Sequence, residues 1–446
     1  MAYAAALGHR PDREGERPYA VPARRPRAQP AGGGPLARWR GRSREGPRCR
    51  NEQGRARRAA GLPQLSLKGS VVRGSLSVAA RILVVLALAV AALPALAATE
   101  DDYRALNRSI VAGHVLPRLA AFARATAALR GTADLACAAR APADVTALRQ
   151  AFVLAMDAWE AIQHVRFGPV EFFSRRSRIF FWPDPRNSVG RQLGALLENG
   201  SPQAITEQSI ARESVAVQGF PALERLLYDE GLAARLTART AAGADTACAV
   251  VRAIAANLAT MARDIDAAWS QGDDAYARYL DQAGPEHVRF HHHREVTLEL
   301  FKSLHTAVEF VADHKLVRPL GASIQAARPR LAEAWRSGRS LANIRTNLAA
   351  AQALYVGTGG GASVSSFVRE IAGERELDEL LTRAFAQTLA TVEGIPGSLG
   401  AGVASAASRR PLDKLLRETR ALKALLAQRL APVLGVPVGF NALDGD

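Results

Sequence analysis

The segment SVAVQGFPALERLLYD, residues 214–229, places one acid within an apolar helical stripe. Leu223 and Leu226 recur at helical spacing, and Glu224 lies between them. Pro221 suits the first turn of a helix, where its missing N–H is not needed and the helix dipole favours an acid. An acid within an apolar stripe also needs a partner. Glu224 is therefore either a favourable charge near a helix start or part of a binding site, and both interpretations stay open.

A second candidate is the aromatic run FFWPDP, residues 180–185. Trp182 and Asp184 lie in a Pro-Asp-Pro turn, which suits either an aromatic plug at a bundle end or a platform for a ligand. Arg166 precedes a Gly-Pro pair at the start of another non-helical stretch. A buried arginine there is a natural partner for Glu224, or for an anionic ligand.

Histidines cluster in EHVRFHHHRE, residues 286–295. His287 and His291 are separated by one helical turn, a spacing at which two imidazoles can bind a divalent metal ion. Neighbouring histidines on a helix point in different directions, so at most two of them cooperate. The run also begins a helix beside a polar linker, and it is equally consistent with a solvated segment.

The sequence motifs of several other enzyme classes are incomplete or absent. The loop TGGGAS, residues 358–363, has neither the lysine nor the strand–loop–helix context of a phosphate-binding loop. The sequence contains no nucleophile elbow and no Cys-x-x-Cys pair. These absences exclude the common hydrolase, nucleotide-binding and thiol-redox motifs.

Positive charge is concentrated at the N-terminal end. The formal net charge is +16, but residues 1–97 hold 18 of the 58 Lys and Arg and 5 of the 42 Asp and Glu. Residues 98–446 therefore carry 40 basic and 37 acidic residues, which is close to balance. The remainder of the chain lacks the basic excess of a nucleic-acid-binding protein, and we expect no nucleic-acid partner.

The stretch ARILVVLALAVAALPALAATEDDY has the pattern of a secretory signal peptide, which we place at residues 78–97. A basic residue precedes a short apolar run, and Ala95-Leu96-Ala97 is a small-x-small cleavage site. A membrane anchor is the alternative, although the apolar run is short for a bilayer. We expect no transmembrane segment in the mature chain.

Residues 1–77 are rich in Arg, Pro and Gly and are predicted to be disordered. They indicate either a translation start assigned too far upstream or a genuine basic tail.

Cys137 and Cys248 are the two cysteines that remain after removal of the leader. An even pair in an exported protein makes a disulfide plausible, and two independent buried thiols are an equal alternative.

The rest of the chain has a helical period. Helices are predicted from Tyr103 with a kink at Pro117, and over about 143–167, 245–270, 291–318, 341–357, 374–393 and 412–430. No alternating run is long enough for a sheet. A domain boundary is expected near 271–285, which divides the mature chain into residues 98–272 and 273–446. The fold class is therefore all-α.

Several non-helical segments together resemble the imelysin-like family of bacterial envelope proteins. They are VRFGPV at 165–170, FFWPDPRNSVGRQL at 180–193, VAVQGFPALERLLYD at 215–229, HKLVRPLG at 314–321 and LGVPVGFNALDGD at 434–446. The resemblance covers nearly all of residues 100–446. It implies two related four-helix-bundle domains exported to the periplasm. Some members are linked to iron acquisition, and the one that gives the family its name is linked to peptidase activity.

Much of that family carries a Gly-x-His-x-x-Glu motif, whose histidine and glutamate can share a metal ion. On this chain the resemblance places the glycine at Gly219 and the glutamate at Glu224, but Pro221 stands at the histidine position. Proline offers no lone pair to a metal, and a metallopeptidase needs three protein ligands with an open position. Peptidase activity is therefore not favoured. The lipid-attachment cysteine of the lipoprotein branch is also absent, which favours a soluble periplasmic protein.

Three functions follow from these observations. The first is a non-catalytic binding protein in metal, chiefly iron, acquisition, with a pocket formed by Gly219, Pro221, Glu224, Arg166, Trp182 and Asp184. Its partner would be a divalent or ferric ion, held by Glu224 or by His287 and His291, or a component of iron uptake. The second is a metallopeptidase that recruits other ligands from afar. The third is a module that binds another envelope protein.

Overall fold

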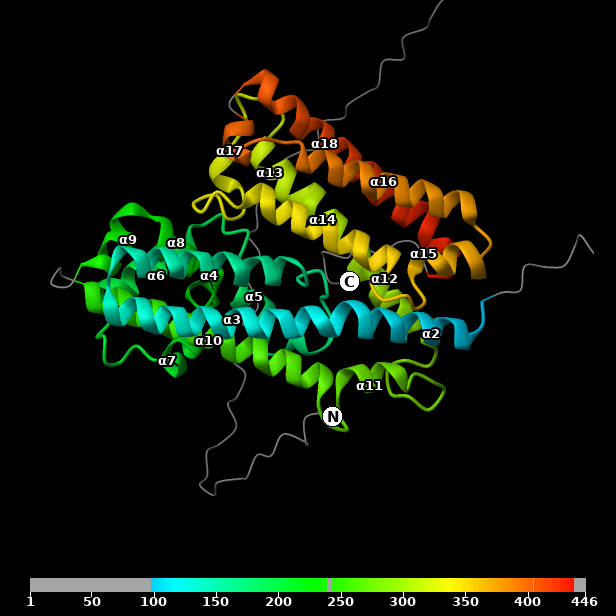
Figure 1. Cartoon of the computed structure of the whole chain (residues 1–446), viewed down its shortest axis with the longest axis horizontal. Coiled ribbons are helices and arrows are strands. Elements are labelled where there is room, and N and C mark those ends of the chain that lie inside the picture. The colour runs from blue at the N-terminus through cyan, green and yellow to red at the C-terminus, as the bar shows by residue number, and fades with distance from the viewer. Residues whose placement is uncertain (1–97, 239–242, 404, 437–446) are drawn as a thin grey trace, which may run out of the picture. The chain divides into compact units, whose positions relative to one another are not determined.

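The computed structural model describes residues 98–238, 243–403 and 405–436, and every regular element in these ranges is a helix (Figure 1). The predicted all-α class is therefore confirmed. The predicted leader (1–77), the predicted signal peptide (78–97) and the tail from 437 lie outside the described residues. Among the helices that are described, none is long and apolar enough to cross a membrane.

Long helices alternate with short 3-10 and π-helical segments, which carry η labels. In the first half these elements are α2 (Glu100–Ile110), η2 (Val111–Val115), α3 (Leu116–Ala139), α4 (Pro142–Glu160), η3 (Gly168–Val170), η4 (Phe172–Ser174), α5 (Arg175–Ile179), α6 (Ser188–Asn199), α7 (Glu207–Arg212), η5 (Val215–Val217), α8 (Phe220–Tyr228), α9 (Glu230–Thr237) and α10 (Ala244–Ser270). In the second half they are α11 (Tyr276–Asp281), α12 (His293–Glu309), η6 (Phe310–Leu316), α13 (Val317–Leu320), η7 (Pro329–Leu331), α14 (Ser340–Val356), α15 (Val364–Ser366), η8 (Phe367–Ile371), α16 (Arg375–Glu393), α17 (Leu399–Gly402), α18 (Ala406–Leu425), η9 (Leu426–Leu430) and α19 (Ala431–Val433).

The first helical segment runs without a break through α2, η2 and α3. The predicted irregularity at Pro117 takes the form of the π-helical turn η2, which lies directly before it. Proline lacks an N–H and its ring crowds the preceding turn, and a wider π turn accommodates both effects. His114 lies in this turn and is buried.

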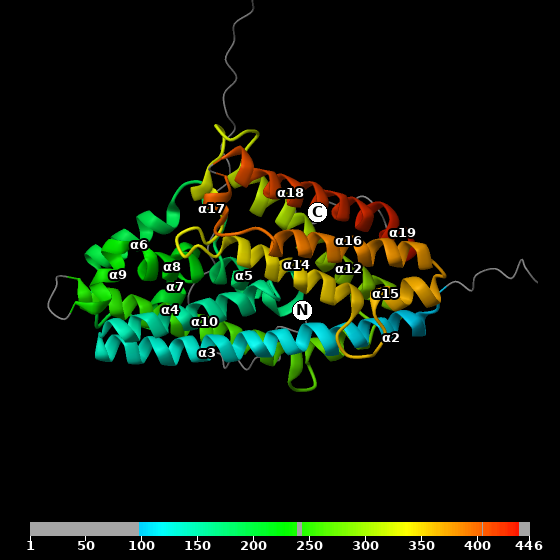
Figure 2. The ribbon, with the colours of Figure 1, turned by 45° about the horizontal axis from the view of Figure 1, so that its top comes forward.

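In the first half, α3 packs along both α4 and α10 (Figures 1 and 2). Phe122, Phe152 and Trp269 are buried between these helices and neighbouring segments. At the far end of α3, Cys137 forms the predicted disulfide with Cys248 of α10, with Cα atoms 5.5 Å apart. The bond joins the two helices at the end remote from η2.

In the second half, α12, α14, α16 and α18 pack against one another, as Figure 2 shows for their neighbouring ribbons. Helix α2 of the first half also packs against α12, so the first helical segment contacts both sets of helices. The expected boundary at 271–285 falls in the segment after α10 that includes α11. The division into two related domains stays a prediction.

The end of α4 differs from the sequence prediction and bears on the site. The helix was expected to reach residue 167, but it ends at Glu160 and the chain turns over 161–164. Glu160, Gln163 and His164 are buried there and have polar partners. Bonds between distant segments therefore override the local helical pattern at this point.

Candidate functional site

A pocket of about 450 Å³ opens where the start of α8, the aromatic loop 180–187 and the segment 330–336 meet. Its lining includes Met156, Trp182, Asp184, Pro221, Glu224, Arg225, Arg318, Arg330, Trp335 and Arg336. The structure thus brings together four of the residues that the sequence singled out, namely Trp182, Asp184, Pro221 and Glu224.

The start of α8 is fixed by a close approach of two backbones. Gly219 is the residue before the helix, and a Cβ atom there would lie 2.1 Å from the carbonyl oxygen of Ile179. Only glycine permits this contact. Pro221 lies in the first turn, as predicted. Together these residues hold the start of α8 against the chain that leads into the aromatic loop.

Glu224 is buried, with 5% of its surface exposed, and its partner comes from the second half of the chain. Its Oε1 accepts hydrogen bonds from the backbone N–H of Ser337 at 2.8 Å and from the Ser337 hydroxyl at 2.7 Å. Burial raises the pKa of Glu224, and the bonds from Ser337 oppose the rise. The acid in the apolar stripe therefore has the partner that its burial requires, and this partner comes from a distant segment of the chain.

The aromatic loop has a structural partner for each of its two predicted site residues. Asp184 accepts hydrogen bonds from the backbone N–H groups of Ser188 at 2.8 Å and Val189 at 2.9 Å, and so caps the start of α6. Trp182 meets the ring of Phe310 edge-on at 5.7 Å. Both side chains also line the pocket, so a capped helix and an aromatic contact hold the loop in place around it.

Arginines supply the dominant charge of the pocket. Arg336 donates to Asp229 at 2.7 Å, and Arg225 lies 3.6 Å from the same carboxylate. Burial and the neighbouring Arg336 lower the pKa of Arg225. Both guanidinium groups approach the Asp229 carboxylate, and Asp184 and Glu224 also lie near Arg225.

The other two pocket arginines are exposed, and neither has a carboxylate partner in the described ranges. Arg318 donates to the ring of His314, and Arg330 lies 5.5 Å above the ring of Trp335, which Arg336 also overlies at 4.2 Å. The two acids of the lining, Asp184 and Glu224, already accept hydrogen bonds from backbone groups. The pocket is therefore a basic site with aromatic walls, suited to an anion.

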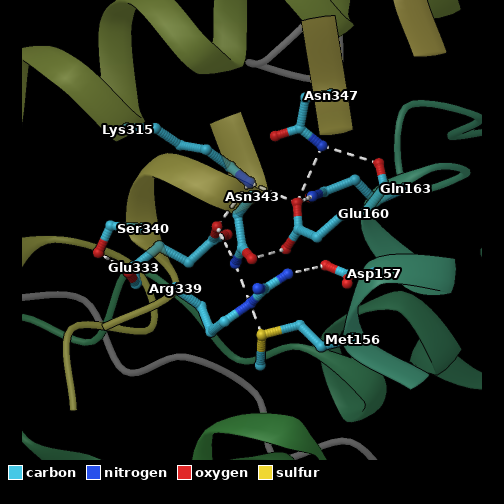
Figure 3. Close-up of polar contacts among 10 residues, drawn as sticks. All are labelled: Met156, Asp157, Glu160, Gln163, Lys315, Glu333, Arg339, Ser340, Asn343 and Asn347. Atoms are coloured by element: carbon cyan, nitrogen blue, oxygen red, sulfur yellow. Dashed lines mark hydrogen bonds and ion pairs between the residues drawn. The ribbon is translucent and has the colours of Figure 1, made fainter. Parts of the chain in front are cut away.

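A buried polar network lies directly behind the pocket, and Figure 3 shows its members. Lys315 is 1% exposed and donates to Glu160 and Glu333, each at 2.6 Å. Asn343 donates to both carboxylates, and it also lies 3.6 Å from the sulfur of Met156, which lines the pocket. The network joins α4, η6, α14 and the segment before α14 through polar groups.

Two carboxylates in this network face a single ammonium group. Burial and the nearby Glu333 carboxylate raise the pKa of Glu160 to about 8, while Lys315 and Asn347 oppose the rise. Glu160 therefore takes up a proton more readily than an ordinary glutamate, and Lys315 is the cation that opposes this uptake.

Arg166 does not pair with Glu224, and this expectation is corrected. Its guanidinium lies 4.6 Å from the ring centroid of Phe310, a ring that Trp182 also contacts. Burial lowers its pKa to about 10. The reason for the difference is that the turn after α4 directs Arg166 to an aromatic face, whereas Ser337 satisfies Glu224. Arg166 reaches the pocket only indirectly, through Phe310 and Trp182.

The helical spacing assumed for His287 and His291 is also corrected, because the segment before His293 is not helical. His287 accepts hydrogen bonds from the backbone N–H groups of Arg289 and Phe290, and His291 contacts the carbonyl oxygen of Pro285. A tight turn fixes His287, so the one-turn argument for a shared metal no longer applies. Neither histidine lines the pocket.

A metal ion in the pocket would find few protein ligands. Across the part of the chain that the structure describes, no group of three or more His, Cys, Asp or Glu side chains is placed to hold a metal ion. In the pocket itself, Asp184 caps a helix and Glu224 is bonded to Ser337. This donor set does not fit a metallopeptidase centre, and a metal role for Glu224 stays a prediction.

Several residues of the site carry no sequence signal that would have identified them. Ser337 and Arg336 lie in an irregular segment, and the Glu160–Lys315–Glu333 group combines residues from distant parts of the chain. A lysine and a glutamate at apolar helical positions were the available signal. They could indicate burial, but not which partners would meet.

Comparison with known proteins gives a consistent picture. The family model described as Imelysin matches residues 115–426. An imelysin-like protein from Psychrobacter arcticum 273-4 has a similar crystal structure, with a TM-score of 0.63 and 23% identity, covering 77% of this chain and 98% of that one. A protein assigned as an iron-regulated protein A precursor from Parabacteroides distasonis matches with a TM-score of 0.62 and 14% identity, covering 76% and 95% of the two chains. No curated protein sequence matches significantly.

Proposed function

Since the chain belongs to the imelysin family, we propose that it is an exported, non-catalytic envelope protein that binds an anionic metal complex, chiefly of iron, in the basic pocket. The observation that carries this proposal is the set of four arginines around the pocket, beside acids that are already hydrogen-bonded within the protein.

The proposal separates iron binding from direct coordination of iron. A ferric ion chelated by small carboxylic acids carries negative charge on its outer surface, and guanidinium groups bind carboxylates in paired hydrogen bonds. The metal would then enter with its own ligands. This accounts for a pocket in which Pro221 replaces the histidine of the family motif and arginines are plentiful.

The proposal that the bound metal is iron rests on similarity to a related protein. One similar structure belongs to a protein assigned as an iron-regulated protein A precursor. This similarity supports a role in iron acquisition for this chain. The arginines of the pocket indicate that the ligand is an anion. A metallopeptidase function is less well supported, because the described residues offer no three-ligand centre.

Export to the periplasm is supported by three observations. Residues 78–97 have the pattern of a signal peptide, and the related protein is assigned as a precursor. The Cys137–Cys248 disulfide suits an oxidising compartment.

The test is calorimetric titration of the protein with ferric citrate, with citrate alone and with uncomplexed ferrous and zinc ions. The informative variant is Arg318→Ala with Arg330→Ala, and Arg130→Ala, an exposed arginine of α3 outside the pocket, is the matched control. We expect saturable binding of ferric citrate that weakens at least about tenfold in the double variant, since each charged hydrogen bond contributes ~1.5–3 kcal/mol. Equal binding by all three proteins would refute the pocket as the binding site.

A further inference from the structure

A second polar site lies apart from the pocket, where two buried histidines face each other. His114 comes from the π-helical turn η2, and His164 comes from the turn after α4. Their Nε2 atoms are 2.8 Å apart, and each residue has only 3% of its surface exposed. The rings meet edge to face at an angle of 66°. Two distant segments therefore deliver two imidazole nitrogens to one point.

The hydrogen bond between the rings leaves further ring nitrogens without partners. One Nε2–H donates to the other Nε2, and both Nδ1 atoms are buried with no hydrogen-bond partner among the described residues. Burial lowers the pKa of His164 to about 3 and that of His114 well below its ordinary value, and the nearby Arg118 adds to both effects. Both imidazoles are therefore neutral at neutral pH. The ring that accepts the hydrogen bond presents an Nε2 lone pair, and the donor ring presents one when its proton moves from Nε2 to its own Nδ1.

We propose that His114 and His164 form a two-coordinate site for a soft monovalent cation of the Cu⁺ and Ag⁺ type. Ions with a filled d shell and a single charge accept two nitrogen ligands in a line. Divalent ions of the zinc type are usually bound by four ligands. The described residues place no group of three or more His, Cys, Asp or Glu side chains together, so this pair does not suit such an ion. The adjacent Arg118 and Arg166 also disfavour a higher charge.

One of the two rings borders a pocket. His114 and Gly113 line a pocket of about 230 Å³, which the glycine loop at 357–361 also lines. A metal–nitrogen distance of about 2.0 Å on each side requires the Nε2 atoms to separate to about 4 Å. The site lies on a π-helical turn, a local irregularity that often marks functional positions in helices.

The test uses Ag⁺ as the probe, because it needs no reductant and leaves the disulfide intact. Every protein carries Cys49→Ser, which removes the remaining thiol. Calorimetry compares His114→Gln and His164→Gln with His291→Gln, an exposed histidine outside the pair. We expect one tight Ag⁺ site in the parent and in His291→Gln. Since losing even an outer-shell partner costs 10–100-fold in metal affinity, each of the other two variants should bind at least about 100-fold more weakly.

A second measurement keeps the proposal testable if a variant does not fold. On addition of one equivalent of Ag⁺ to the parent, the ring ¹⁵N signals of two histidines should shift together, with Nε2 as the bound atom. Zinc should leave these signals unchanged. Absence of the shift, Ag⁺ binding that persists in His114→Gln, or equal binding of zinc at the pair would each overturn the assignment.

Discussion

The carboxylate of Glu224 and the side chain of Ser337 are joined by a hydrogen bond of 2.7 Å, although 113 residues separate them in the chain. The backbone N–H of Ser337 adds a second bond at 2.8 Å. A single buried acid in α8 is thus held by a segment of the second half. Residues of α8 and of the segment 330–336 both line the pocket, and this contact ties the two segments together.

Replacing Ser337 by alanine should destabilise the protein. The substitution removes the hydroxyl donor from a buried carboxylate while the backbone donor remains, so we expect a loss of about 1–3 kcal/mol in the free energy of unfolding. Urea denaturation measures it. Ser270→Ala is the control, because Ser270 is exposed and bonds only within its own helix, and it should change stability by no more than about 0.5 kcal/mol. Equal effects of the two substitutions would contradict the role given to Ser337.

Replacing Glu224 by glutamine separates the two accounts of the pocket. If the pocket binds an anion through arginines, removal of the one buried carboxylate in its lining should leave ferric citrate binding unchanged or make it tighter, since a like charge is lost. The amide oxygen can still accept the bonds from Ser337. If Glu224 instead coordinates the metal, the same variant should lose binding. Calorimetry with the variant decides between these outcomes.

Removing Lys315 should have a large effect on stability. Lys315→Met leaves Glu160 and Glu333 buried without their shared cation, and breaking a buried ion pair on one side costs about 3–5 kcal/mol. Adding Glu160→Gln and Glu333→Gln to this variant should recover much of the loss, because no charge then remains unpaired. Lys414→Met, at an exposed position, is the matched control. A loss in Lys315→Met no greater than in the control would contradict the account of the network.

The raised pKa of Glu160 predicts a pH dependence of stability. Between the ordinary value of 4.5 and about 8, the folded state holds a proton on Glu160 that the unfolded state has released. The contribution of this group is therefore fully present below 4.5 and is lost as the pH rises towards 8. One proton gives a slope of at most about 1.4 kcal/mol per pH unit.

The measurement is the free energy of unfolding at several pH values between 5 and 9, compared between the parent and Glu160→Gln. The difference between the two should change steadily across this interval, with the parent losing stability relative to the variant as the pH rises. Parallel curves would show that Glu160 binds no extra proton in the folded protein.

The sequence allowed the fold class, the disulfide and much of the pocket to be predicted. Helical periodicity identified the long helices, and unusual local combinations such as Gly219 with Pro221 and the run around Trp182 marked the pocket. These features are local, since each arises from the preferences of residues close together in the chain.

The parts that could not be predicted depend on contacts between distant segments. Arg166 was expected beside Glu224, but the turn at 161–164 directs it to the ring of Phe310. Ser337 has no feature in the sequence that distinguishes it from other serines. Partners of buried charges are chosen by the packing of whole helices, and a single sequence does not encode that choice in any short pattern.

The most direct test of the central claim is to locate iron in crystals of the protein grown with ferric citrate, from the anomalous scattering of iron. We predict one iron peak in the pocket lined by Trp182, Arg318 and Arg330, surrounded by citrate oxygens that the arginines bind. A peak coordinated directly by side chains of the protein, in the pocket or elsewhere, would contradict the account, as would crystals with no iron in the pocket.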